Sequence, residues 1–293
     1  MFYDLNLNYD NTNNTSIEKY RQMCELLTSA ICDNYSIIAI NTNRKGTLAS
    51  SDTIPYKEFD LKIIYQNYSL KFLNSPNCSL VDWTKIKLLN RITISISDSK
   101  DLFQFTNPAK SPMQSYDILA VSPANEKMFE QCLNDLNVDL VSLDFEEKIN
   151  FPLKKHHILA AIDKNTFFEI VYGGFIKDTS KRSLFISNVL LLLDVTKGKN
   201  ILISSGAESY YEHRSPYDII TIFETIFEMK PDIVKKMLSD TCEKVILKSI
   251  QRKYFKNVIV LEVDNICSNT NNEKLGTYGG NKDIRMIIET EKI

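Results

Sequence analysis

The chain has 293 residues, of which 43% are hydrophobic and 25% are charged, with a net charge of −2 and a pI near 6.0. These values are ordinary for a globular protein with a large core, and the length suits a single (β/α) barrel, which typically needs ~250 residues. The near-neutral charge argues against a free-standing nucleic-acid binder, although it allows a local basic patch within a larger assembly.

Neither a signal peptide nor a membrane span is predicted. Asp4 interrupts the start of the chain, and the richest apolar stretch, residues 183–195, is too short and too polar to cross a bilayer. The six cysteines contain no Cys-x-x-Cys pair, and no histidine lies near one at ligand spacing. We therefore expect reduced, mostly buried thiols in an intracellular protein.

The first predicted strand, residues 2–8, carries apolar side chains on one face and polar ones on the other. Strict alternation puts Phe2, Asp4, Asn6 and Asn8 on one face, and the polar members of that face need water or hydrogen-bond partners. In a barrel, such partners are found at the mouth formed by the C-terminal strand ends. The alternative is that Asp4 and Asn6 only cap a turn.

This opening also resembles that of the PHP metal-dependent phosphoesterases, which begin Asp-Leu-His-x-His and bind metals with the two histidines. Asn6 and Asn8 stand at the two histidine positions in this chain. A neutral Asn binds transition metals far more weakly than imidazole does. The frame of a metallophosphatase is therefore present without its metal ligands.

A helix and a second strand follow and complete a βαβ unit within the first forty residues. The run Thr15-Ser16-Ile17-Glu18 has the pattern of a capping box, and the helix after it carries Ile17, Tyr20, Leu27 and Ile31 at helical spacing. Residues 35–41 form a near-continuous apolar run, which is typical of a buried parallel strand.

Residues 42–84 are predicted to be an insertion that makes a surface excursion or binds a partner. Residues 43–46 suggest a basic turn, and the segments around Pro55 and Pro76 suggest loops. Residues 61–73 are compatible with either a short strand or a helix.

After the insertion, strands and helices alternate to the end of the domain. The predicted strands are residues 86–96, 116–121, 138–143, 158–162, 167–172, 200–205 and a late strand at 258–263. The predicted helices are one capped by Asn125, then residues 179–196, 216–229, 231–239 and 241–253. In the helix at 179–196, we expect Leu184, Ser187 or Asn188, Leu191 and Val195 to face the core, with Gly198 as the C-cap. The domain thus spans residues 1–263, and the Asn-, Ser- and Gly-rich residues 264–293 are predicted to be a disordered tail.

Enzymatic motifs are weak. His156 and His157 follow two lysines in a predicted loop, and His213 beside Arg214 suits either a surface position or RNA stacking. Ser204-Ser205-Gly206 ends a strand but lacks the Gly-x-Ser-x-Gly elbow, and neither a P-loop nor a Gly-x-Gly-x-x-Gly motif is present.

Several basic residues and two serines instead fall at the ends of predicted strands, and strand-to-helix loops lie on one face of a barrel. Arginine, serine and the free amides of a helix N-terminus together make a phosphate site. The predicted RNA-binding residues are Arg91, Lys177, Lys181, Arg182, Ser204, Ser205 and Arg214. The alternative is that these are solvated charges paired with Asp178, Glu208 or Asp218.

The order of the segments resembles one family, the thirty-kilodalton protein subunit of eukaryotic and archaeal ribonuclease P, which fungi share with ribonuclease MRP. The resemblance covers residues 1–255 and excludes the insertion and the tail. The matching segments are Asp4-Leu5-Asn6-Leu7, Ala39-Ile40-Asn41, Arg91-Ile92-Thr93-Ile94, residues 116–121, Glu126-Lys127, residues 138–141, residues 168–172, Ile176-Lys177-Asp178, Arg182, residues 198–205 and residues 214–218.

The resemblance implies a TIM-barrel-like, PHP-related α/β fold without its own active site. It implies a non-catalytic subunit that supports an RNA enzyme in removing the 5′ leader of precursor tRNA and in processing rRNA. The implied partners are the ribonuclease P and MRP RNA, a small ferredoxin-like subunit, the other protein subunits and, through the complex, precursor tRNA. No cofactor is expected on this chain, Mg²⁺ is expected on the catalytic RNA, and the location is the nucleus and nucleolus.

Two alternatives stay open. One is an active PHP-like metal-dependent phosphoesterase, against which the asparagines at positions 6 and 8 count. The other is a scaffold that contacts only proteins.

Overall fold

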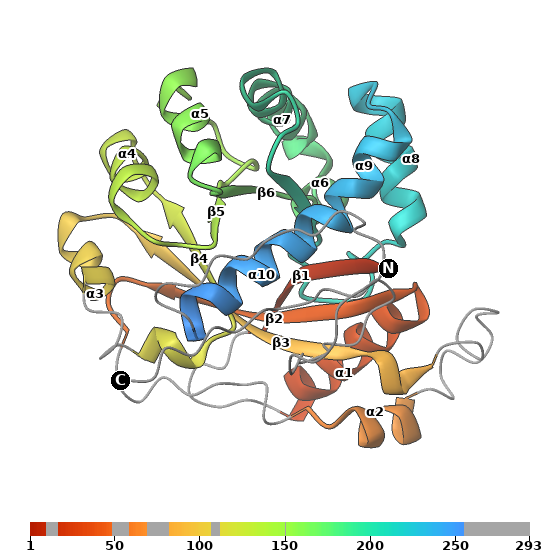
Figure 1. Cartoon of the computed structure of the whole chain (residues 1–293). Coiled ribbons are helices and arrows are strands. Elements are labelled where there is room, and N and C mark those ends of the chain that lie inside the picture. Colours follow the sequence, from red (N-terminus) through yellow and green to blue (C-terminus); the bar gives the residue numbers. More distant parts are fainter. Residues whose placement is uncertain (10–16, 49–58, 69–81, 107–111, 150, 255–293) are drawn as a thin grey trace, which may run out of the picture.

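Seven parallel strands form the centre of the computed structural model, and each pairs with the next in sequence order (Figure 1). The structure describes residues 1–9, 17–48, 59–68, 82–106, 112–149 and 151–254. The strands are β1 (Phe2–Asn8), β2 (Tyr35–Lys45), β3 (Lys87–Ile96), β4 (Ile118–Pro123), β5 (Leu140–Ser142), β6 (Phe167–Val171) and β7 (Ile201–Ser204).

The segment after β7 brings the sheet back to β1. Leu7 forms an isolated parallel bridge with Ala207, whose carbonyl accepts a hydrogen bond of 2.9 Å from the amide of Asn8. The amide of Gly206 donates to the carbonyl of Asn6 at 2.9 Å. These contacts produce a nearly closed barrel, so the predicted TIM-barrel-like α/β class is confirmed.

Helices surround the barrel. They are α1 (Ile17–Cys32), α2 (Leu61–Tyr68), α3 (Phe103–Thr106), α4 (Glu126–Asp135), α5 (Lys155–Asp163), α6 (Gly173–Lys177), α7 (Arg182–Thr196), α8 (Pro216–Phe227), α9 (Pro231–Met237) and α10 (Asp240–Tyr254). Figure 1 shows α10 running across one end of the barrel. That end is the N-terminal one, because Lys248 and Arg252 contact the backbone just before β5 and β4. Among the described residues, no helix has the length and apolar character needed to cross a bilayer.

Two apolar clusters make up the core. The larger lies between the strands and the outer helices, and it includes Ile38, Ile92, Phe129 and Phe223. The smaller fills the barrel, and α10 contributes Cys242 and Val245 to it; its strand residues are Tyr3, Leu5, Ala39, Leu89, Ile118, Ala120, Leu140, Phe167 and Leu202. The N-terminal half of the barrel is therefore a packed apolar interior closed by a helix.

A β-bulge in β1 overturns the predicted alternation of its side chains. Asp4 pairs with Ile38 and Leu7 with Ile40, so β1 has one residue more than β2 between these pairs. Leu5 lies in the interior cluster, Asn6 bonds to interior side chains, and Leu7 belongs to the outer core. Because the extra residue shifts the pleat, Leu5 and Asn6 face the same side.

One predicted strand is wrong. Residues 158–162 lie in helix α5, in which only Ile158 and Ala161 are buried, three positions apart. This is helical spacing, and the two central alanines favour a helix. The short apolar run by itself fits either element.

The prediction for the inward face of α7 is right for Asn188 and Val195 and wrong for the two leucines. Its buried face consists of Phe185, Asn188, Val189, Leu192, Val195 and Thr196, whereas Leu184 and Leu191 are exposed. The four consecutive leucines at 190–193 fit two helical faces, and Asn188 selects one by donating to the carbonyls of Phe145 and Glu147 at 3.1 and 2.8 Å.

Other predictions hold in part. Ile17 is exposed, and β2 continues through the predicted basic turn to Lys45. Part of the insertion is the helix α2, while the capping box and the late strand at 258–263 lie outside the described residues, as does the tail.

Cys24, Cys132 and Cys242 are buried free thiols as expected, but the expectation is wrong for Cys32, which is disulfide-bonded.

Candidate functional site

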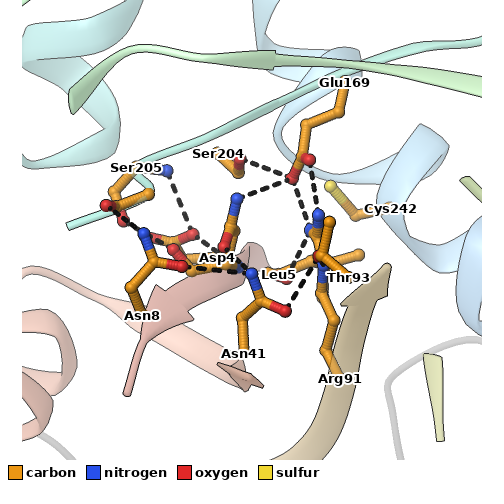
Figure 2. A network of polar contacts seen from close by, with 12 residues as sticks. Asp4, Leu5, Asn8, Asn41, Arg91, Thr93, Glu169, Ser204, Ser205 and Cys242 are labelled. Atoms are coloured by element: carbon orange, nitrogen blue, oxygen red, sulfur yellow. Dashed lines mark hydrogen bonds and ion pairs between the residues drawn. The ribbon is translucent and has the colours of Figure 1, made fainter. Parts of the chain in front are cut away.

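A polar layer lies directly above the apolar interior, toward the C-terminal ends of the strands. Ala39, Leu89, Phe167 and Leu202 each precede by two positions a polar side chain on the same face of the strand. These polar side chains are Asn41, Arg91, Glu169 and Ser204, and all four are buried. Figure 2 shows them converging with the end of β1.

Arg91 and Glu169 form the centre of this layer. Both side chains are fully buried, and Nη2 of Arg91 donates to Oε2 of Glu169 at 2.6 Å while Nη1 contacts Oε1. Nη1 also donates to the carbonyl of Leu5 at 2.9 Å, and Nε donates to the hydroxyl of Thr93 at 3.2 Å. Arg91 was predicted to bind RNA, but the structure places it inside the barrel, where a carboxylate already holds it.

Four asparagines line the mouth beside this pair. Nδ2 of Asn41 donates to the side-chain oxygens of Asn6 (2.8 Å), Asn8 (3.1 Å) and Asn43 (3.1 Å). Asn6 donates to Glu169 at 3.3 Å, and Asn8 donates to the carbonyl of Gly206 at 2.8 Å. The two positions that resemble metal-ligand positions in phosphoesterases thus hold amides whose side-chain oxygens both accept from Asn41.

These residues do not fit a catalytic transition metal. Amide oxygens are weak ligands for such ions, and the nearby carboxylate of Glu169 is occupied by the guanidinium of Arg91. The described part of the chain contains no cluster of three or more His, Cys, Asp or Glu side chains able to hold a metal ion.

Ser204 and Ser205 are buried, which places their hydroxyls away from the surface. Ser204 donates to Oε1 of Glu169 at 2.6 Å, and Ser205 donates to the carbonyl of Asn6 at 3.2 Å. The amide of Ser205 donates to Asp4 at 3.2 Å. Both residues were predicted to bind RNA, and in the structure they join β7 to β1 and β6.

Lys177 and Lys181 lie on the rim that follows β6, and both form ion pairs. Lys177 lies 3.3 Å from Glu212 and 3.9 Å from Glu208, and these carboxylates raise its pKa. Lys181 lies 2.7 Å from Glu146, which raises its pKa. For these two lysines the paired-charge alternative describes the structure, although the partner of Lys181 was not among those expected.

The two glycines after β6 allow this close packing. The amide of Gly173 donates to the carbonyl of Ser205 at 2.8 Å, and an added Cβ would lie 2.6 Å from that oxygen. A Cβ on Gly174 would overlap the side chain of Glu146. Only glycine therefore lets α6 start against β7 while Glu146 reaches Lys181.

Arg182 and Arg214 differ from the lysines because neither pairs with a carboxylate among the described residues. Nε of Arg182 donates to the carbonyl of Phe175 at 2.9 Å, and the guanidinium lies 5.3 Å from the centre of the Phe175 ring. Nη1 of Arg214 donates to the carbonyls of Tyr211 and His213, both at 2.7 Å. Backbone carbonyls orient both cations without neutralising them.

His213 is buried, contrary to both interpretations of its sequence position. Nε2 lies 3.3 Å from Asp4 on β1, and Nδ1 lies 3.4 Å from Asp33, which follows α1. Its ring packs edge-on against Tyr35. Burial disfavours the imidazolium, but Asp33 and Asp4 outweigh this effect and raise the pKa of His213 above 6.5. No local signal in the sequence indicates this contact, because its three residues are far apart in the chain.

Replacing His213 by glutamine should destabilise the fold more in acid than in alkali. A raised histidine pKa contributes stability that is complete below 6.5 and is lost as the pH rises through the folded-state value. The expected loss at acid pH is about 1–3 kcal/mol, measured by urea unfolding over a pH series. The exposed His156 offers a control, H156Q, without this pH dependence. An equal loss at all pH values would contradict the assignment of a charged His213.

The sequence has clear relatives. The family model described as RNase P subunit p30 matches residues 1–254. The chain is similar to Protein GAMETOPHYTE DEFECTIVE 1 of Arabidopsis thaliana, with 32% identity over 79% of this chain and 40% of that protein. It is similar to Ribonuclease P protein subunit p30 of Mus musculus, with 37% identity over 57% of this chain and 62% of the relative. It thus spans less than two thirds of either protein.

A third relative is covered more fully. The chain is 30% identical to Probable ribonuclease P protein subunit 3 of Schizosaccharomyces pombe, over 72% of this chain and 88% of that protein. This alignment covers most of both proteins, so the similarity is not confined to a short part of either one.

Solved structures share the fold. A chain of archaeal ribonuclease P, solved by cryo-EM with mature tRNA, aligns with a TM-score of 0.57 and 16% identity over 92% of this chain and all of that chain. Organophosphorus hydrolase from Deinococcus radiodurans aligns with a TM-score of 0.51 and 10% identity over 84% of this chain and 91% of that chain. At these identities the likeness concerns the barrel alone.

Proposed function

The chain belongs to the family of RNase P subunit p30, and on that premise we propose that it is a non-catalytic protein subunit of ribonuclease P. In this role it supports the catalytic RNA in removing the 5′ leader of precursor tRNA. We extend the proposal to ribonuclease MRP and rRNA processing, because the similar protein of Saccharomyces cerevisiae is named a ribonuclease P/MRP subunit. The proposed location is the nucleus, and within it the nucleolus.

The partners follow from the same proposal. They are the ribonuclease P or MRP RNA, a small ferredoxin-like subunit and the other proteins of the complex, with precursor tRNA reached through the assembly. Mg²⁺ is assigned to the RNA, not to this chain. The pI near 6.0 suits a subunit that contacts RNA through a restricted surface.

The match over residues 1–254 carries the proposal, and the polar layer supports its non-catalytic part. A PHP-like phosphoesterase would need metal ligands at the mouth of the barrel. Asn6 and Asn8 occupy those positions, and Arg91 neutralises the adjacent Glu169. These contacts favour a scaffold over the phosphoesterase alternative.

The proposed RNA contacts are the two arginines without carboxylate partners, Arg182 and Arg214. Replacing either by alanine should weaken assembly with the RNA by about 1–3 kcal/mol, because a guanidinium holds a phosphate with two hydrogen bonds. The slope of log K against log salt should fall by about one for each lost phosphate contact. The measurement is assembly with the RNA and partner subunits over a salt series.

Lys236 provides a matched control. This residue is an exposed cation on α9. The end of α9 packs beside Gly198, just before β7, so Lys236 lies toward the end of the barrel opposite the rim. K236A should assemble with an unchanged salt slope. If R182A and R214A fold normally and also keep the slope, the rim does not bind RNA, and the subunit is a scaffold that contacts only proteins.

A further inference from the structure

The segment between β7 and α8 presents an exposed aromatic ring. Tyr211 is 70% exposed, which makes it one of the most exposed large hydrophobic side chains of the described structure. Tyr210 supports it from one side, since the ring centres are 3.9 Å apart with a tilt of 33°. The opposite ring face is therefore available to a ligand.

Arg214 lies against the backbone of the same segment. Nη1 donates to the carbonyls of Tyr211 and His213, while Nε and Nη2 have no protein partner among the described residues. A guanidinium held in this way loses little conformational freedom when it binds an anion. The segment thus combines a free aromatic face with an oriented cation.

Contacts from two strands and from the residue that follows a third hold the segment in place. The hydroxyl of Tyr35 on β2 donates to the carbonyl of Arg214 at 3.1 Å. The amide of Arg214 donates to the hydroxyl of Tyr172, which follows β6, at 3.2 Å. His213 is buried against Asp4 on β1. The segment that carries Tyr211 and Arg214 is consequently held in place before any ligand binds.

The acidic residues of the segment contact a cation other than Arg214. Glu208 and Glu212 both contact Lys177 at the end of α6, and Glu212 also accepts a hydrogen bond from the amide of Glu208 at 3.0 Å. They do not pair with Arg214. Its positive charge is therefore available to an anion from outside the chain.

We propose that Tyr211 and Arg214 bind one unpaired nucleotide of RNA, with the base stacked on the Tyr211 ring and a phosphate held by Arg214. The proposal rests on the function proposed above and assigns a structural class to the RNA. An aromatic face binds any base that is free of its own stack, whereas the bases of a duplex are already stacked and paired. Binding at this site should have no strong sequence preference.

The test uses the full chain, fluorescein-labelled decauridylate and a ten-base-pair RNA duplex in fluorescence-anisotropy titrations. Y211A should weaken binding of decauridylate by about 10-fold while Y211F retains it, because the ring and not the hydroxyl makes the stack. R214A should weaken both ligands and R214K should recover only part, since lysine lacks the planar fork. Circular dichroism spectra and melting temperatures establish that each variant is folded.

Four outcomes would overturn the site. Three belong to the titrations: the wild-type chain does not bind decauridylate, Y211A binds it with wild-type affinity, or Y211A weakens both ligands equally. The fourth is that the Y211A complex loses a protein subunit when it is assembled without RNA. The last would make this surface a protein interface. The salt-series assembly with R182A is a separate measurement. The site at Tyr211 and Arg214 can therefore be disproved while the subunit still associates with RNA. Failure of both experiments would remove the proposed RNA contact as well.

Discussion

Replacing Arg91 by leucine is expected to lower the free energy of unfolding by about 3–5 kcal/mol, the largest effect of any single change considered for this protein. Glu169 would stay in the barrel interior without its counterion, at a position that is 0% exposed. Ser204 and Asn6 would still donate to its carboxylate. Two neutral donors cannot replace a guanidinium that binds both oxygens. Urea unfolding followed by circular dichroism measures the loss.

A double variant and a surface variant make this result specific. R91L combined with E169L removes both buried charges and should recover much of the stability, because an apolar pair avoids the desolvation cost. K181A breaks an ion pair whose side chains are 41% and 36% exposed, and it should cost no more than about 1 kcal/mol. A cost for R91L that matches K181A would mean that the interior pair is open to water.

The second large effect is expected at the opposite end of the barrel. Asp139, just before β5, is 0% exposed and accepts hydrogen bonds from Arg252 on α10 at 3.1 and 3.0 Å. Burial raises the pKa of Asp139, and the charge and hydrogen bonds of Arg252 oppose that rise, so the arginine favours the charged form of a buried carboxyl. R252A should destabilise the fold by about 3 kcal/mol and loosen α10 from the interior that it closes.

The pH dependence of this loss identifies its cause. In R252A the cost comes from burying an unpaired carboxylate, and protonation removes that charge. The stability difference from wild type should therefore be larger at neutral pH than in acid. K253A, which breaks the neighbouring and more exposed pair with Asp117, should cost less than about 1 kcal/mol. A difference that does not vary with pH would assign the effect to lost packing.

These two buried ion pairs stabilise the interior of the barrel and are separate from the cations proposed to contact RNA. Arg252 and Asp139 fix the helix that seals the N-terminal end, and Arg91 and Glu169 fill the layer in which related barrels hold reacting groups. Arg182 and Arg214 lie outside both pairs and have no carboxylate partner among the described residues. Replacing either of these arginines therefore leaves both buried ion pairs intact.

The local pattern of the chain predicts most elements of the fold. The apolar runs of β2 and β3, the N-cap at Asn125 and Pro216 at the start of α8 each indicate the element that the structure contains. These signals involve residues within a few positions of one another, and so they act through local backbone geometry. The same order of strands and helices places Lys177, Arg182 and Arg214 after β6 and β7 at one end of the barrel.

What the sequence determined by itself is therefore the order of most of the elements, the family and the end of the barrel at which the candidate functional side chains gather. Only the tertiary structure decided which side each of those side chains faces. The bulge in β1 turns Asn6 inward, Arg91 meets a carboxylate 78 positions away, and His213 meets Asp4 across the barrel seam. Buried strands are apolar on both faces, so periodicity does not distinguish inside from outside. That choice depends on pairing between residues far apart in the chain, which no local pattern records.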